Sequence, residues 1–247
     1  MNKLIEMDKA FNDLKNSYRH LRNNLLLSEY QASSRYCYII SAGHGGTDSI
    51  TGQYTTAPAK QHKHEKGEFH GDRFFYEGVF NRIIADKLCK KLKEAKMVYK
   101  KLYHDTQDWS LKYKKDQANN HHTNAQKSIL IDLHSNAFDG SARGFSVYTS
   151  KGQTAADPIA SKLWQLVRPL GKKYNFPMRS QTWKDNDYDF ESRLYMLDQT
   201  ICPSILPECL FFDNFEDASI LMLESFQDDY VSALFELIKW CEKSIKV

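Results

Sequence analysis

Four residues with catalytic or metal-binding side chains stand at or near the ends of predicted core elements. His44 follows the β-prone run 36–40, and His134 closes the apolar run 128–133. Glu77 opens a predicted helix, and Glu208 lies in the last predicted strand. Two imidazoles and a carboxylate leave positions open for water, as in hydrolytic zinc sites, and a further glutamate nearby is placed to act as general base. These residue types indicate metal-assisted hydrolysis.

Each of these residues also has a purely structural explanation. A histidine that ends a strand is commonly a hydrogen-bonded loop residue, and a glutamate at a helix start complements the helix dipole. The glycines around His44, at positions 43, 45 and 46, are compatible with a simple turn. Position alone therefore leaves the metal site and the structural explanations equally open.

Alternating strands and helices predict an α/β fold. The expected strands cover residues 36–40, 97–103, 128–134, 144–149 and 204–212. The expected helices cover residues 77–95, part of 112–127, 157–174 and a terminal stretch that begins at about 217 or 228. Asp157 and Pro158 supply an N-cap and a proline at the first helical position, whereas Pro207 argues for a bulge or an edge position. We expect a single domain with a mixed, mostly parallel central sheet flanked by helices, and site residues at its carboxyl edge.

The first 34 residues predict an amphipathic helix that precedes the domain. Apolar residues recur there at alternating steps of three and four, at Leu4, Met7, Phe11, Leu14, Tyr18, Leu21 and Leu25. We expect this helix to pack on its own domain, and self-association through it stays open, because about three heptads is near the lower limit for a coiled coil. The chain is accordingly divided into an N-terminal extension, 1–34, and a catalytic domain, 35–247.

Composition excludes several classes of protein. The 247 residues are 41% hydrophobic and 26% charged with a net charge of +3, as in a soluble globular protein rather than a disordered chain or a nucleic-acid binder. The five cysteines form no CxxC pair, so we expect them to be buried and unpaired. The N-terminus has no signal-peptide pattern and the chain has no apolar run of about 18 residues, so we expect synthesis in the cytoplasm and no membrane span.

Four local motifs occur in a fixed order along the chain. They are Gly43-His44-Gly45-Gly46-x-Asp48, Glu77-Gly-Val-Phe-Asn81, His134-Ser-Asn136-Ala137, and a last one from Pro203 through Glu208 and Phe211 to Asn214-x-Glu216. In this order, and on these predicted elements, the motifs resemble those of zinc-dependent N-acetylmuramoyl-L-alanine amidases of the Amidase_3 type. The resemblance extends from about Tyr36 to the C-terminus.

This resemblance implies a ligand set, a base and a substrate. His44, Glu77 and His134 would bind Zn²⁺, and Glu208 would be the catalytic glutamate that takes a proton from water and delivers it to the leaving amine. The bond cut joins the lactyl group of N-acetylmuramic acid to L-alanine in peptidoglycan. Asn136 and Arg193 are the candidates for substrate contact, Arg193 by meeting a stem-peptide carboxylate, and a structural role in a turn or behind a ligand is an equal alternative for Asn136. Gly45 and Gly46 would let the backbone pass close to metal and substrate, and Asp48 would form a turn or support a ligand.

Several alternatives remain open at this stage. Another zinc-dependent peptidase or deacylase on the same scaffold would use the same ligands, whereas a binding-only relative is disfavoured because all four positions are intact. A phage endolysin, a recycling enzyme and a mobile-element enzyme all fit a cell-wall hydrolase without a signal peptide. In the long loop 47–73, His62, His64 and His70 are expected to be solvated rather than to bind a second metal. Trp183 and Tyr188 either stack on a sugar or pack against the domain.

Overall fold

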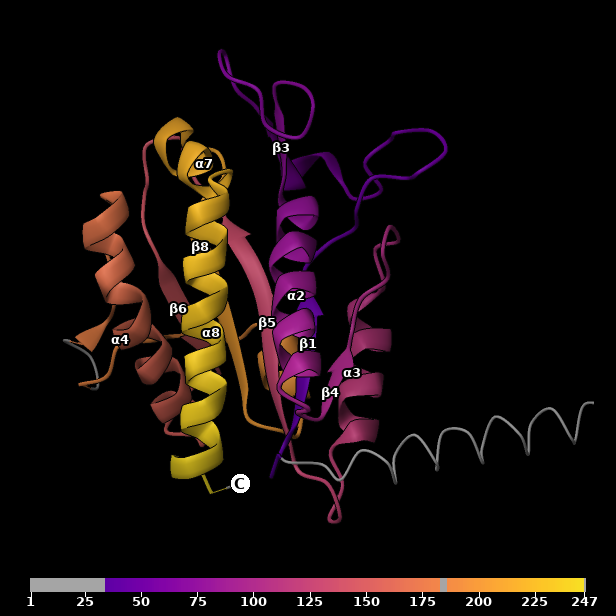
Figure 1. Ribbon diagram of the computed structural model, residues 1–247, viewed down its shortest axis with the longest axis vertical. Helices are drawn as coiled ribbons and strands as arrows, with labels where there is room; N and C mark the ends of the chain where they lie inside the picture. The colour runs from indigo at the N-terminus through magenta and orange to yellow at the C-terminus, as the bar shows by residue number, and fades with distance from the viewer. Residues whose placement is uncertain (1–33, 183–185, 247) are drawn as a thin grey trace, which may run out of the picture.

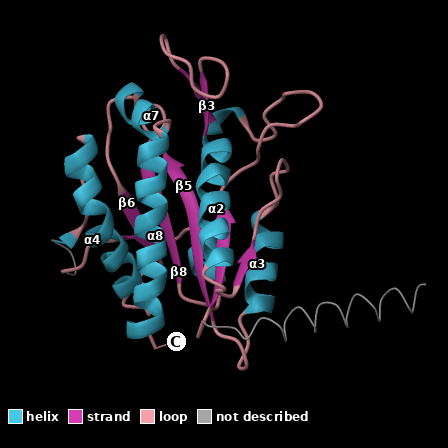
Figure 2. Ribbon diagram, in the orientation of Figure 1, coloured by secondary structure: helices cyan, strands magenta, loops and turns pink. Residues whose placement is uncertain are grey.

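The computed structural model describes residues 34–182 and 186–246. Its centre is a six-stranded sheet in the order β4-β1-β5-β8-β6-β7 (Figures 1 and 2). The strands are β1 (Cys37–Ala42), β4 (Tyr99–Lys101), β5 (Ser128–Asn136), β6 (Ser146–Thr149), β7 (Phe190–Glu191) and β8 (Ser204–Phe211). β4, β1, β5 and β8 are mutually parallel, whereas β6 is antiparallel to β8 and parallel to β7. The sheet is therefore mixed and mostly parallel, as the sequence predicts.

Helices cover both faces of this sheet. They are α2 (Glu77–Glu94), α3 (Leu111–His121), α4 (Asp157–Tyr174), α6 (Tyr195–Gln199), α7 (Phe215–Leu221) and α8 (Glu224–Ser244). α2, α4 and α8 cover one face, with α8 packed against both α2 and α4, whereas α3 contacts α6 on the other face (Figure 1). The result is a three-layer domain, which confirms the predicted fold class.

The alternation of side chains along β1 and β5 divides the interior into two cores. Tyr38, Ile40, Ile129 and Ile131 join the large core beneath α2, α4 and α8. Ile39 and Leu130 point the other way, into a smaller core that also holds Leu102, Ala118, Met196 and Cys202. Because side chains alternate faces along a strand, Asp132 and His134 lie on the α3 side of β5, together with Leu130.

Most predicted elements form where the sequence places them, with four differences. β8 is an interior strand rather than an edge strand, although the pairing between β5 and β8 does shift, after Glu208, and Leu210 adopts a φ of 60° there. The N-cap position of α4 is Ala156, which forms no side-chain cap, and not the predicted Asp157. The Asp157 carboxylate instead accepts from the Thr154 amide and hydroxyl in the preceding turn. The terminal helix is two helices, α7 and α8.

The fourth difference lies in the predicted loop 47–73. It contains a short 3-10 helix, η1 (Pro58–Lys60), and the strand β2 (Gln61–Lys63), which pairs with β3 (Phe74–Tyr76) as a small antiparallel hairpin. The hairpin lies above the carboxyl end of the parallel strands in Figure 1. Packing of aromatic side chains stabilises this hairpin. His64 packs on Phe69 with ring centroids 4.4 Å apart, and Phe75 is fully buried.

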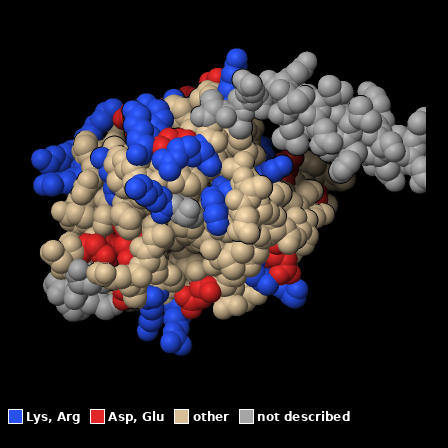
Figure 3. Space-filling view, turned by 90° about the horizontal axis from the view of Figure 1, so that it is seen from below, with Lys and Arg blue, Asp and Glu red and all other residues tan. Residues whose placement is uncertain are grey.

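The remaining expectations concern the termini and the surface. The predicted N-terminal helix, with its proposed self-association, lies outside the described residues. All five cysteines are buried and free, as predicted. Among the described helices none is long and apolar enough to cross a bilayer. The face seen from below carries lysines and arginines over much of one half, with acidic side chains between them (Figure 3).

Candidate active site

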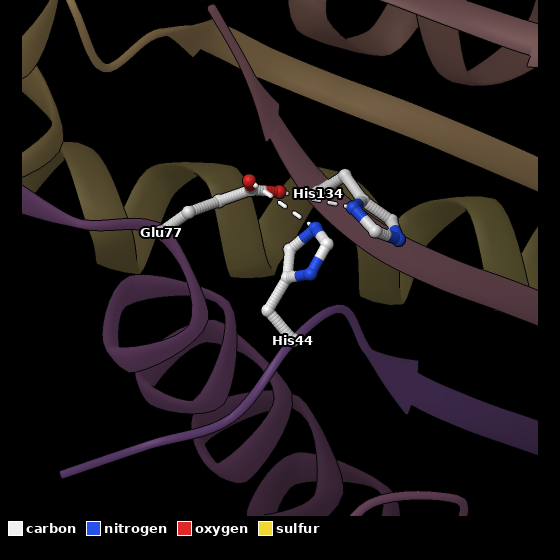
Figure 4. Close-up of side chains that lie close together, drawn as sticks. All are labelled: His44, Glu77 and His134. Atoms are coloured by element: carbon white, nitrogen blue, oxygen red, sulfur yellow. Dashed lines mark hydrogen bonds and ion pairs between the residues drawn. The ribbon is translucent and has the colours of Figure 1, made fainter. Parts of the chain in front are cut away.

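His44, Glu77 and His134 converge at the carboxyl edge of the parallel strands (Figure 4). His44 follows β1 in a left-handed backbone conformation, with φ of 62°. Glu77 is the first residue of α2, and His134 lies near the end of β5. One donor atom from each residue lies within 4.8 Å of the others, the only such group of three among the described residues. The structure therefore brings together all three predicted ligands.

The two oxygens of Glu77 face the two imidazoles. Oε1 lies 3.0 Å from His134 Nδ1, and Oε2 lies 3.3 Å from His44 Nε2. Both His44 Nε2 and Glu77 Oε2 are buried and have no hydrogen-bond partner, although Lys60 Nζ lies 3.7 Å from Glu77 Oε2, within ion-pair range. Unpartnered buried polar atoms are costly, and two that face each other across a short gap fit a bound cation. Imidazole nitrogen and carboxylate oxygen are donors that suit zinc.

The local charge also favours a cation at this point. Although burial alone would lower the pKa of His134, the adjacent carboxylates of Asp132 and Glu77 raise it to about 10. Burial opposes ionisation of Glu77, but the adjacent imidazoles of His134 and His44 hold the pKa of its carboxyl well below the usual range. The carboxylates that hold a proton on the buried His134 imidazole stabilise positive charge at this point. The same attraction acts on a metal ion.

Glu208 stands beside the three residues on the neighbouring strand. Its Cα pairs with that of His134 in the β5–β8 register, so both side chains rise from the same edge. Burial, together with the charges of Glu77 and Asp132, raises the pKa of Glu208 to about 8, and one carboxylate oxygen is buried without a partner. Raised carboxyl pKa values are common for groups that exchange protons during catalysis.

The substrate-contact candidates take different places. Asn136 ends β5, two residues after His134, where it interacts with the Tyr148 side chain near Glu208. Arg193 is exposed and follows β7, which runs antiparallel to the β5–β8 pair. The chain leaving β7 therefore heads for the opposite edge of the sheet, where α6 leads into the start of β8. The structure groups Asn136 with the site and does not group Arg193 with it.

Gly43 is the glycine on which the ligand geometry depends. A Cβ at position 43 would lie 2.1 Å from the His134 ring. Gly45 and Gly46, expected to face metal and substrate, instead pack against the Thr55 hydroxyl and the Asp105 carbonyl. Asp48 forms a turn by accepting from the Ile50 and Thr51 amides. These three positions therefore shape the loop rather than the metal site itself.

Sequence reasoning missed Arg82, which ties the His44 loop to its neighbours. Its guanidinium donates to the carbonyl oxygens of His44 at 2.7 Å, Gly78 at 2.8 Å, His104 at 2.9 Å and Gln107 at 3.2 Å. Arg82 is only 7% exposed. No local pattern singled it out, because at helical spacing Arg82 lies opposite the apolar face that Phe80, Ile84 and Leu88 form.

The other candidate residues have structural contacts. His64 Nε2 lies 3.0 Å from the Phe212 carbonyl oxygen, and His62 packs edge-on against His64. Tyr188 stacks on Trp164, with ring centroids 4.2 Å apart, so packing explains its aromatic ring. Trp183 lies outside the described residues.

Comparison with known proteins agrees with this geometry. Residues 39–239 match the family model Amidase_3, described as N-acetylmuramoyl-L-alanine amidase. The fold is similar to an N-acetylmuramoyl-L-alanine amidase from Clostridium difficile 630, with 21% identity and a TM-score of 0.65 over 86% of this chain and 100% of that one. No curated protein sequence matches the chain.

Two further solved structures share the fold. The catalytic domain of CwlV, an amidase from Bacillus (Paenibacillus) polymyxa var. colistinus, is 19% identical with a TM-score of 0.60, over 83% of this chain and 96% of that one. The catalytic domain of the CD27L endolysin, which targets Clostridia difficile, is 17% identical with a TM-score of 0.55, over 83% and 97%. With the family model spanning most of its length, the chain belongs to the Amidase_3 family of N-acetylmuramoyl-L-alanine amidases.

Proposed function

We propose that His44, Glu77 and His134 hold a zinc ion with which the protein hydrolyses the amide bond between N-acetylmuramic acid and L-alanine in peptidoglycan. The observation that carries this proposal is the convergence of two imidazoles and a carboxylate with unpartnered buried atoms beside Glu208. A bound zinc ion supplies Lewis-acid polarisation of the scissile carbonyl and lowers the pKa of water toward about 7.

Glu208 moves the proton in this proposal. Its carboxylate takes a proton from the attacking water and returns it to the nitrogen of L-alanine as the amide bond breaks. Glu208 suits this role because it pairs with His134 on the neighbouring strand and has a buried carboxylate oxygen without a hydrogen-bond partner. Asn136, at the end of β5, is placed to donate a hydrogen bond to the substrate.

The chain's other residues hold these groups in position. Gly43 leaves room for the His134 ring, and Asn81 donates to the Gly43 carbonyl and to Glu77. The backbone amide of Ser135 also donates to Glu77 Oε1, at 3.3 Å. We take residues 35–247 as the catalytic domain and the bacterial cell wall as its place of action. An endolysin role is one form of that action.

Zinc content and activity together test these assignments. The full chain is loaded with zinc, dialysed and analysed for metal, and activity is measured as release of stem peptide from purified peptidoglycan. We expect one zinc per chain in the wild type, in Glu208→Gln and in the control His62→Ala. His44→Ala and His134→Ala should lose the zinc and the activity.

Glu208→Gln should keep the zinc but lose activity by about 10²- to 10⁴-fold, the usual effect of removing a general acid–base group. Loss of zinc in Glu208→Gln would make Glu208 a ligand instead. Loss of zinc in His62→Ala would move the metal to the hairpin.

A further inference from the structure

A cavity of about 360 Å³ opens beside the metal-site histidines on the α3 side of the sheet. His44 and His134 line one wall, and Asp108, Trp109 and Leu111 line the other. This volume lies within the range of small-molecule sites, about 300 to 1,000 Å³. The cavity therefore adjoins the proposed reaction centre through His44 and His134, and Trp109 and Leu111 give its other wall an apolar surface.

The order of the strands decides which half of the substrate reaches this cavity. β5 separates β1 from β8 in the sheet, so Glu208 and the cavity stand on opposite sides of His134. Glu208 must reach the nitrogen of the leaving amine, and the stem peptide that begins there therefore extends toward β8. The acyl half, which is the lactyl group and its sugar, is left to extend toward β1 and the cavity.

The charges on the two sides agree with this direction. On the β8 side, the Arg179 guanidinium lies over the Phe211 ring at 4.9 Å, and the charges of both Arg179 and Glu208 reach the Tyr148 hydroxyl. A positive group suits a stem peptide, which carries carboxylates. On the cavity side, the charge of Lys114 is paired with Asp132, and Asp108 is exposed and negative. Asp108 would repel a carboxylate but can accept hydrogen bonds from sugar hydroxyl groups.

The aromatic wall is held firmly in place. Tyr113 contacts Trp109 edge-on at 4.9 Å, and Ser110 caps α3 by accepting from the Tyr113 amide. Arg82 bonds both the His44 carbonyl and the Gln107 carbonyl, so a single guanidinium joins the two walls. An indole in a fixed position beside an exposed leucine, which is 50% exposed, offers an apolar surface to the C–H face of a pyranose ring.

We propose that this cavity, with Trp109 as its platform, is the subsite for the N-acetylmuramic acid ring. The inference rests on the proposed amidase function, and it adds which end of the substrate lies on which side of the metal. In this arrangement the uncharged sugar of the acyl half binds next to Asp108. The stem peptide, which begins with the leaving amine, extends toward Arg179.

Two substrates that differ only in the sugar test this assignment. One is an N-acetylmuramoyl peptide, and the other is the same peptide acylated by D-lactate alone. In the zinc-loaded full chain, Trp109→Ala should raise KM for the muramoyl peptide by about tenfold, the effect of one lost aromatic contact. It should leave kcat for that substrate and kcat/KM for the lactyl peptide within about twofold of the wild type.

The conservative variant Trp109→Phe should restore most of the affinity for the sugar, and the control Ile201→Ala, at an exposed position on the opposite edge, should change nothing. Equal losses on both substrates would show that Trp109 only supports the metal site, and no loss on either would place the sugar elsewhere. Both results overturn the proposal.

Direct binding separates this inference from the amidase function. The probe is the disaccharide of N-acetylglucosamine and N-acetylmuramic acid, without a peptide and with its lactyl carboxyl group blocked as the methyl ester so that it is uncharged, titrated into the full chain by calorimetry. We expect binding by the wild type and weaker binding, by about tenfold, by Trp109→Ala. If the wild type cleaves neither substrate but binds the disaccharide through Trp109, the amidase function fails and the sugar subsite stands. Absence of disaccharide binding contradicts the subsite.

Discussion

Lys114 and Asp132 form a buried ion pair directly behind His134. Lys114 Nζ lies 3.4 Å from Asp132 Oδ1, and the two side chains are 4% and 1% exposed. The other carboxylate oxygen of Asp132 lies 3.5 Å from His134 Nε2. Because Asp132 engages Nε2, the Nδ1 atom of His134 is left to face Glu77 and the metal site. A carboxylate behind a metal-binding histidine is a common way to fix ring orientation.

Removing Asp132 should weaken metal binding without removing a ligand. We expect Asp132→Asn to lower zinc affinity by about 10- to 100-fold, as is usual when the group that orients a metal-binding histidine is lost. Competition with a chromophoric chelator measures the change. Asp139→Asn, in an exposed turn, serves as the matched control. An unchanged zinc affinity in Asp132→Asn would show that the carboxylate has no part in positioning His134.

Removing Lys114 should cost stability instead. Lys114→Met leaves the buried Asp132 carboxylate with only the Ser41 hydroxyl and His134 as partners and without its lysine, so we expect the free energy of unfolding to fall by about 3–5 kcal/mol. Urea denaturation measures this change. Lys112→Met, which breaks an exposed pair with Asp116, should cost less than about 1 kcal/mol. The double variant Lys114→Met with Asp132→Asn should recover part of the loss, and its failure to do so would rule out an uncompensated charge as the cause.

The sequence predicts the candidate metal ligands but not the residues that hold them in place. His44, Glu77 and His134 stand at element ends, and in-register local motifs surround them, so both position and resemblance single them out. Lys114 lies in a Lys- and Asn-rich stretch that resembles a solvated helix face. Its burial depends on α3 packing across the sheet from α2, which no local pattern contains. Asp132 was the available clue, because a charge inside a buried strand requires a partner.

The same limit applies to β8 and to Arg82. Pro207 indicates a bulge or an edge position, and the structure has the bulge: the sheet order places β8 between β5 and β6, and its pairing with β5 shifts after Glu208. This order is set by which strands pair over long sequence distances, and local propensity carries no information on it. The four carbonyl groups that Arg82 bonds likewise come from three separate segments, so its role appears only once those segments are assembled.

Arg82 should be needed for an ordered site. Arg82→Lys keeps the charge but cannot reach four carbonyl oxygens at once, because a single ammonium replaces a planar guanidinium with five donors. We expect lower zinc affinity together with a lower melting temperature in this variant. Chelator competition and thermal denaturation, with the exposed Arg73→Lys as control, measure the two effects. Wild-type zinc affinity and melting temperature would contradict the role of Arg82.

Asp189 should make the stability of the protein depend on pH. Burial and the neighbouring Asp187 raise its pKa from 3.8 to about 7. Between these two values the unfolded chain releases the Asp189 proton while the folded chain keeps it, so stability from this group is present at low pH and is lost as the pH rises toward 7.

Asp189→Asn should therefore flatten the stability curve between about pH 4 and 7 and should stabilise the fold above pH 7. Urea denaturation across this range measures the effect, with the exposed Asp198→Asn as control. A pH dependence identical to that of the wild type would show that Asp189 titrates normally.

The bond that His44, Glu77, His134 and Glu208 are proposed to cleave is the amide between N-acetylmuramic acid and L-alanine. Analysis of the reaction products tests this assignment most directly. Purified peptidoglycan is digested with the zinc-loaded full chain, and the soluble products are identified by mass spectrometry, with Glu208→Gln and a chelator-treated sample as controls. We predict stem peptides that begin with a free L-alanine amine, absent from both controls. Products cut inside the stem peptide would contradict the account, because they would keep the metal site but make the protein a peptidase.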